Sequence, residues 1–166
     1  MNEQDLIRFE AIALPHLDAA YTLARYLVRD THDAEDAVQE AYLRALKYFG
    51  SYRGGDPRAW LLAIVRNECR TRRERGAPSE PFEDERHSPE SASADALALE
   101  TEAKETLREA LDLLPAEFRE VIVLREIQGL SYQEIADIVK APIGTVMSRL
   151  SRGRARLEKT VKAGRS

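Results

Sequence analysis

The sequence has few of the residues and motifs that catalysis, metal binding or disulfide bonding require. Its 166 residues include one cysteine, Cys69, and three histidines, which are scattered along the chain. A single cysteine excludes an intramolecular disulfide and suits a reducing compartment. A CxxC pair, a Walker-type phosphate loop and a GxSxG motif are all missing. We therefore expect no enzyme, no metal site and no cofactor.

Long apolar runs are also missing. The longest clear one, AWLLAIV at 59–65, is far too short to cross a bilayer. The first ten residues, MNEQDLIRFE, are polar and acidic and do not resemble a signal peptide. These features predict a cytoplasmic protein without membrane insertion.

Two segments of the chain carry an excess of charge, one basic and the other acidic. The net charge is −4, but residues 143–166 hold seven basic and one acidic side chains, while 76–96 hold one basic and six acidic. Such asymmetry indicates a basic end that meets nucleic acid. The acidic segment 76–96 also carries three prolines and several serines, the composition of a flexible linker.

The fold is expected to be all-α, because Ala, Leu, Glu and Arg are abundant and strand-type runs are few. The composition change at 76–96 divides the chain into two small helical domains, 1–75 and 97–166, joined by this flexible acidic linker. Apolar spacing predicts helices over 33–49, 57–73, 97–113, 132–139 and 143–161.

The C-terminal domain has the pattern of a helix-turn-helix over about 131–150. Ser131 and Glu134 form an S-x-x-E capping box. The turn KAP (140–142) separates the short helix from the last one. In such motifs the second helix enters the major groove of DNA. The polar stripe of this second helix carries five candidate DNA contacts. Three lie early enough in the helix to reach base edges, namely Thr145, Ser148 and Arg149. Two lie further along and suit phosphates, namely Arg152 and Arg156. A solvated basic face is the alternative.

Two helices of the N-terminal domain carry further candidates. The helix 33–49 presents Asp36, Gln39, Glu40 and Leu43 on its outer face. An exposed leucine among carboxylates and an amide suits docking of a basic partner. An ordinary solvated face with one leucine is equally compatible with the spacing.

The helix 57–73 has Arg66, Arg70 and Arg73 at i, i+4 and i+7, with Asn67 beside them. Arginines next to aromatic residues favour single-stranded nucleic acid, although Trp60 itself is expected in the core. The alternative is that these arginines are simply solvated.

Three segments, in this order, resemble the sigma-70 family of bacterial RNA polymerase sigma factors, in its extracytoplasmic-function (ECF) branch. DAEDAVQEAYLRAL (33–46) resembles region 2.2, FGSYRGGDPRAWLLAIVRNECRTRRER (49–75) resembles regions 2.3 and 2.4, and LDLLPAEFREVIVLREIQGLSYQEIADIVKAPIGTVMSRLSRGRARL (111–157) resembles region 4. The helix-turn-helix pattern is shared with LuxR-type regulators, and the DAEDAVQE motif separates the two families.

The resemblance implies a role for each candidate surface. Docking on the β′ clamp helices of core RNA polymerase is implied for Asp33, Asp36, Gln39, Glu40 and Leu43. Capture of the single-stranded −10 element is implied for Arg53, Trp60, Arg66, Asn67, Arg70 and Arg73. Readout of the duplex −35 element is implied for Thr145, Ser148, Arg149, Arg152 and Arg156. Region 4 is also expected to rest on the β flap, and an anti-sigma factor to hold the protein inactive.

Two other functions stay open on the sequence alone. One is a stand-alone, LuxR-like helix-turn-helix regulator that binds duplex DNA without polymerase. The other is a sigma-mimicking protein that binds only an anti-sigma factor.

Overall fold

The protein is all-α, as the composition predicts. The computed structural model describes residues 2–75 and 95–165, and all regular structure in these two ranges is helical. The predicted linker, 76–96, lies outside the described residues apart from its last two positions. Those two positions are helical, because the fifth α-helix begins at Asp95.

The first half of the chain forms a helical layer whose ends follow from local capping. Its elements are α1 (Glu3–Ala13), η1 (Leu14–His16, a 3₁₀ turn), α2 (Leu17–Leu27), α3 (Thr31–Lys47), η2 (Phe49–Ser51, a 3₁₀ turn) and α4 (Pro57–Arg75). α3 begins two residues before its predicted start, because the Asp30 carboxylate accepts hydrogen bonds from the backbone N–H groups of His32 and Asp33. At α4, Asp56 accepts from the N–H of Arg58, and Pro57 takes the first helical position.

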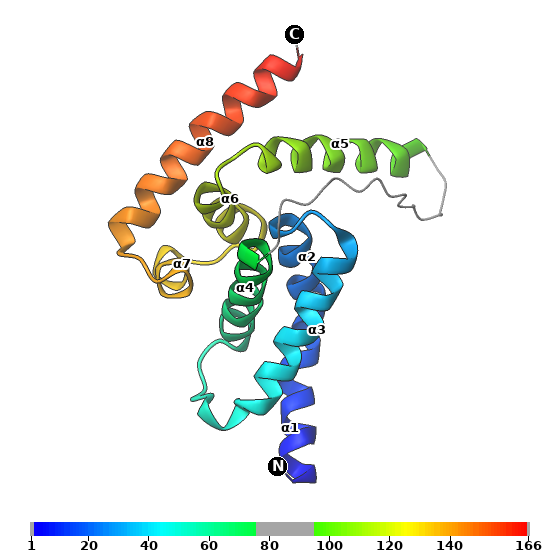
Figure 1. Cartoon of the computed structure of the whole chain (residues 1–166), viewed down its shortest axis with the longest axis vertical. Helices are drawn as coiled ribbons and strands as arrows, with labels where there is room; N and C mark the ends of the chain where they lie inside the picture. The colour runs from blue at the N-terminus through cyan, green and yellow to red at the C-terminus, as the bar shows by residue number, and fades with distance from the viewer. Residues whose placement is uncertain (1, 76–94, 166) are drawn as a thin grey trace.

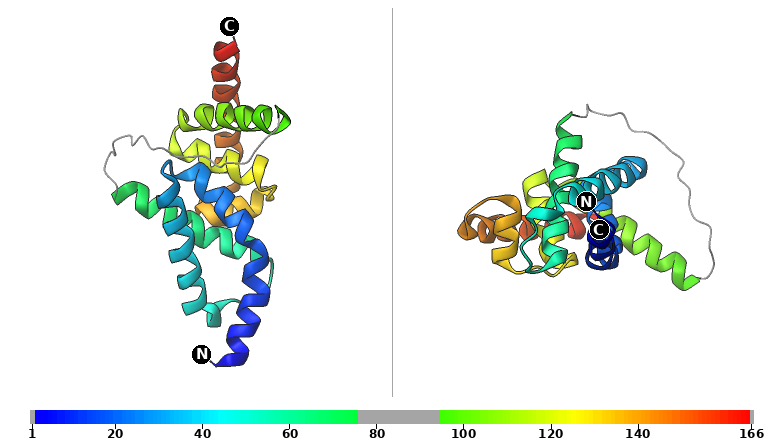
Figure 2. Two further views of the ribbon diagram at one scale, coloured as in Figure 1. Left: turned by 90° about the vertical axis from the view of Figure 1, so that its right-hand side faces the viewer. Right: turned by 90° about the horizontal axis from the view of Figure 1, so that it is seen from below.

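The second half contains the predicted helix-turn-helix. Its elements are α5 (Asp95–Asp112), α6 (Ala116–Ile122), η3 (Val123–Ile127, a π-helical turn), α7 (Tyr132–Val139) and α8 (Ile143–Arg165). Gly129 ends the segment before α7 with φ of +71°, a conformation that glycine adopts without strain. α8 continues four residues past its predicted end, and its far end projects beyond the other helices (Figure 2).

The two halves pack against each other. Buried residues of α2, α3 and α4 form one continuous core with those of α6, η3, α7 and α8. α4 contacts α7, and α2 contacts α5 and α6 (Figure 1). The sequence predicted α3, α4, α5, α7 and α8 but did not predict that the halves share a core.

Candidate nucleic-acid and protein interfaces

The outer face of α3 is built as the sequence predicts. Its inner stripe, Ala34, Ala37, Val38, Ala41 and Ala45, is buried in the core. On the other side Asp33, Asp36 and Gln39 are exposed and Glu40 is partly buried. Leu43 lies in this acidic face and is 58% exposed. The exposure of Leu43 is confirmed, while its role in docking stays a prediction.

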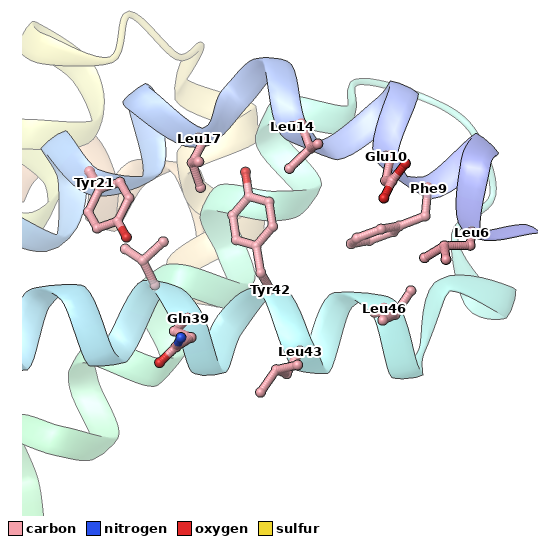
Figure 3. Close-up of a pocket in the computed structure, with 11 residues that line it drawn as sticks. Leu6, Phe9, Glu10, Leu14, Leu17, Tyr21, Gln39, Tyr42, Leu43 and Leu46 are labelled. Atoms are coloured by element: carbon pink, nitrogen blue, oxygen red, sulfur yellow. The ribbon is translucent and has the colours of Figure 1, made fainter.

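An apolar groove adjoins this face and was not foreseen from the sequence. It has a volume of about 370 Å³ and lies between α1–α2 and α3. Figure 3 shows Tyr42 reaching from α3 toward Leu14 and Leu17, where α1 and α2 meet, while Leu43 points outward from α3 at the edge of the groove. The Tyr42 hydroxyl donates a hydrogen bond to the carbonyl oxygen of Ala13 at 2.8 Å, and burial raises its pKa to about 12. The exposed Leu43 is therefore part of a larger apolar surface that includes the groove.

The loop before α4 is held by an aromatic cluster. The rings of Tyr52 and Trp60 lie 4.8 Å apart, and Phe49 packs against both. The Tyr52 hydroxyl donates to the carbonyl of Gly55 at 2.8 Å, which fixes the turn in which Gly54 and Gly55 both have positive φ. Trp60 is half-buried and packs against the cluster that contains Phe49 and Leu61, so it lies at the edge of the core and not inside it as expected. Arg53 is exposed.

The structure does not place the three arginines of α4 on one exposed stripe. Arg66 is only 4% exposed and makes two hydrogen bonds to the Glu120 carboxylate on α6, at 2.8 and 2.9 Å. Asn67 and Arg70 are exposed, and Arg73 is half-buried. Arg70 pairs with Glu74 at 3.0 Å. In this arrangement Arg66 faces the second half of the chain and does not face solvent, which corrects the expectation of a continuous basic stripe.

Glu120 is a residue that the sequence analysis missed. The signal available was a carboxylate inside the apolar segment FREVIVL (118–124), whose neighbours Val121 and Ile122 are buried. A buried carboxylate needs a cationic partner. Which of the chain's arginines supplies that partner depends on how the two halves pack, and spacing along one helix does not reveal it.

The predicted helix-turn-helix is present, with α7 and α8 as its two helices. The capping box is complete: Ser131 N–H donates to the Glu134 carboxylate at 2.9 Å, and Glu134 N–H donates to the Ser131 hydroxyl at 3.1 Å. Val146, Leu150 and Gly153 of α8 face the core. Along the other side of α8, Ser148, Arg152 and Arg156 are exposed and Thr145 and Arg149 are partly exposed.

Two basic side chains near this stripe have intramolecular partners. Arg154 donates twice to the Glu126 carboxylate, at 3.0 and 2.6 Å, and that hydrogen bonding raises the pKa of its guanidinium. The guanidinium of Arg156 lies over the Phe118 ring at 5.4 Å from the ring centroid, within the limit of about 6 Å for a cation–π contact. Ser148 and Arg152 are therefore the most freely presented members of the predicted −35 set.

Several polar contacts besides Arg66–Glu120 join the two halves. Gln128, which is buried, donates from its side-chain amide to the carbonyl of Ala19 at 3.1 Å. The carbonyl of Gln128 accepts from Arg58 at 2.7 Å. Arg108 donates to the carbonyl oxygens of Val28 and Arg29 at 3.1 and 3.2 Å.

Within the described ranges, no group of three or more His, Cys, Asp or Glu side chains is arranged to hold a metal ion. No helix in the same ranges has the length and apolar character needed to cross a membrane.

Two protein-family models match the chain. The model of sigma-70 region 2 matches residues 12–77, and that of sigma-70 region 4 matches residues 104–157. The first match covers the helix that bears Leu43 together with α4, and the second covers the helix-turn-helix. A match to region 2 favours the sigma-factor interpretation over a stand-alone regulator.

Curated relatives agree with this assignment. The chain is 34% identical to the ECF RNA polymerase sigma factor SigE of Mycolicibacterium smegmatis over 90% of its length, although it spans only 60% of that relative. It is 33% identical to the ECF RNA polymerase sigma-E factor of Escherichia coli, covering 86% of this chain and 80% of the relative. It is 30% identical to the RNA polymerase sigma-H factor of Pseudomonas aeruginosa, covering 92% and 86%.

Solved structures of two other proteins align with nearly the whole chain. The sigma factor RpoE of Bartonella quintana, solved in complex with the anti-sigma factor NepR, matches with a TM-score of 0.76 and 32% identity, covering 93% of this chain and 97% of that one. CnrH, solved with the cytosolic domain of CnrY, matches with a TM-score of 0.68 and 27% identity, covering 93% and 88%. The chain belongs to the sigma-70 family of RNA polymerase sigma factors, in the ECF branch.

Proposed function

We propose that this chain is a dissociable initiation factor that binds core RNA polymerase and directs it to promoters. The polymerase carries out the chemistry, and the chain supplies promoter recognition and strand opening. The observation that carries the proposal is Leu43, an exposed leucine in the acidic outer face of α3 that continues into the apolar groove. A partner with apolar side chains flanked by basic ones is complementary to this surface.

We assign the docking contact on polymerase to the β′ clamp helices. The residues of this chain that contact them are Asp33, Asp36, Gln39, Glu40 and Leu43. The −10 element is assigned to the loop 50–56 and α4, where flipped bases can stack on aromatic side chains and phosphates can meet arginines. The −35 element is assigned to α8, whose exposed stripe includes Ser148 and Arg152. Because this work requires polymerase and chromosomal DNA, we place the chain in the cytoplasm.

An anti-sigma factor is proposed as a further partner. Support comes from RpoE of Bartonella quintana, which was solved in complex with the anti-sigma factor NepR and aligns with nearly the whole of this chain. The groove beside α3 is apolar and open, so a helix with an apolar stripe can occupy it.

The docking assignment is tested by Leu43→Glu. Leu43 is exposed, so the substitution leaves the core intact, but it places a charge at the centre of the docking surface. We expect Leu43→Glu to reduce co-purification with core RNA polymerase at least about 100-fold, the loss of roughly 3 kcal/mol that a central apolar contact supplies.

Ile7→Glu is the matched control. Ile7 on α1 is 59% exposed, nearly the same as Leu43, and it does not line the groove. It should bind polymerase as the wild type does. Normal polymerase binding by Leu43→Glu, with helical content unchanged in circular dichroism, contradicts the docking assignment.

A further inference from the structure

The contact between the two halves is centred on a buried ion pair. Arg66 of α4 and Glu120 of α6 are both 4% exposed, and the two hydrogen bonds between them are 2.8 and 2.9 Å long. The remaining guanidinium nitrogen donates to the side-chain oxygen of Asn67 at 3.1 Å. Arg70–Glu74 of α4 lies at the surface. Glu68 of α4 is 7% exposed, but its partners Arg44 and Arg72 belong to the first half, so it does not join the two halves.

Burial makes this pair different from the surface pairs. A charge that has been taken out of water is tolerated only while its partner remains, and removal of one partner leaves the other uncompensated. Exposed pairs contribute little because water and salt replace them. The two halves also share an apolar core, and the Arg66–Glu120 pair makes their packing sensitive to one buried charge.

Arg66 is also a residue that the sequence assigns to DNA. A guanidinium that makes a bidentate bond to a carboxylate can bond a phosphate in the same way. It cannot do both, because Glu120 occupies both Nε and Nη2. α7, the first helix of the helix-turn-helix, additionally packs on α4.

We propose that the Arg66–Glu120 pair is a latch that holds the two halves of the chain closed and keeps Arg66 from nucleic acid until they separate. Separation releases Arg66 for phosphates of the −10 strand. In the closed arrangement Ser148 and Arg152 remain exposed, so the latch covers one DNA contact and leaves the other accessible. The consequence for DNA rests on the proposed function, whereas the latch itself does not.

The latch is tested by Glu120→Gln, which keeps the side-chain shape but leaves Arg66 without its counter-charge. We expect the ratio of open to closed chains to rise roughly 10-fold or more. The measurement is small-angle X-ray scattering of the full chain. A compact chain of 166 residues has a radius of gyration of about 15 Å, which increases when the halves separate.

Two variants serve as controls. Glu117→Gln removes an exposed carboxylate from the same helix and should leave the radius of gyration unchanged. Arg66→Met combined with Glu120→Leu replaces the pair by apolar side chains, which pack without counter-charges, and should stay compact. An unchanged radius for Glu120→Gln overturns the latch. So does expansion of the double variant, because lost packing would then explain the effect.

A second measurement separates the latch from the proposed function. Binding of a single-stranded, A/T-rich 20-mer is followed by fluorescence anisotropy. Glu120→Gln should bind it more tightly than the wild type, in proportion to the rise in the open fraction, because the apparent dissociation constant falls as the competent fraction rises. Expansion without tighter binding supports the latch and contradicts the −10 assignment of Arg66.

Discussion

At the scale of single residues, Cys69 offers a test of the shared core. Its side chain is buried between helices, and burial raises the pKa of the thiol from 9.0 to about 12. The unfolded chain therefore loses the thiol proton at lower pH than the folded chain does. The stabilisation that this pKa difference represents is present below pH 9 and is lost as pH rises toward 12.

We expect the free energy of unfolding to fall by up to about 1.4 kcal/mol per pH unit above pH 9. Urea denaturation at several pH values between 8 and 10 measures this slope. The upper limit of pH 10 keeps the contribution of Tyr42 to the slope small, because the pKa of Tyr42 is raised from 10.0 to about 12. Cys69→Ala should flatten the slope. An equal slope in the variant would mean that the thiol is not the titrating group.

Residue positions were predictable from the sequence when one helix determined them. The exposed Leu43 and the buried alanines of α3 follow from helical spacing, and so does the polar stripe of α8. Arg66 did not follow, because its spacing fits an exposed stripe but its surroundings depend on Glu120, 54 positions further along the chain. Short-range periodicity carries no information about such a partner.

At the scale of elements, the capping box of α7 supports the helix-turn-helix. We expect Ser131→Ala to lower the free energy of unfolding by about 1 kcal/mol, because the N–H of Glu134 loses its acceptor. For a chain of this size the melting temperature should fall by about 2–4 °C. Ser151→Ala, an exposed position within α8, is the control and should change stability by less than about 0.5 kcal/mol. Equal melting temperatures for wild type and Ser131→Ala would contradict the role of the cap.

Elements were predictable where capping residues and apolar periodicity agreed. α7 matches the predicted range, and the helix over 33–49 starts at Thr31 because Asp30 is its cap. The π-helical turn at Val123–Ile127 was not predicted, since it interrupts a segment that reads as regular helix. The groove beside α3 was not predicted either, because it requires α1 and α2 to be placed against α3.

At the scale of the whole molecule, the arrangement of the halves decides which surfaces are available. The outer face of α3 and the stripe of α8 are both open to solvent, while Arg66 is covered by the second half. Two contacts carried by one chain reinforce each other, because binding of the first raises the effective concentration of the second. A modest affinity of α8 for duplex DNA is therefore enough once polymerase holds the first half.

Run-off transcription on a library of genomic fragments tests the central claim most directly. Core RNA polymerase is assayed with the chain, without it, and with Leu43→Glu. We predict transcripts that start at defined sites only when polymerase and the wild-type chain are both present. The account is contradicted if the chain adds no such transcripts, or if it protects duplex DNA at specific sites equally well without polymerase.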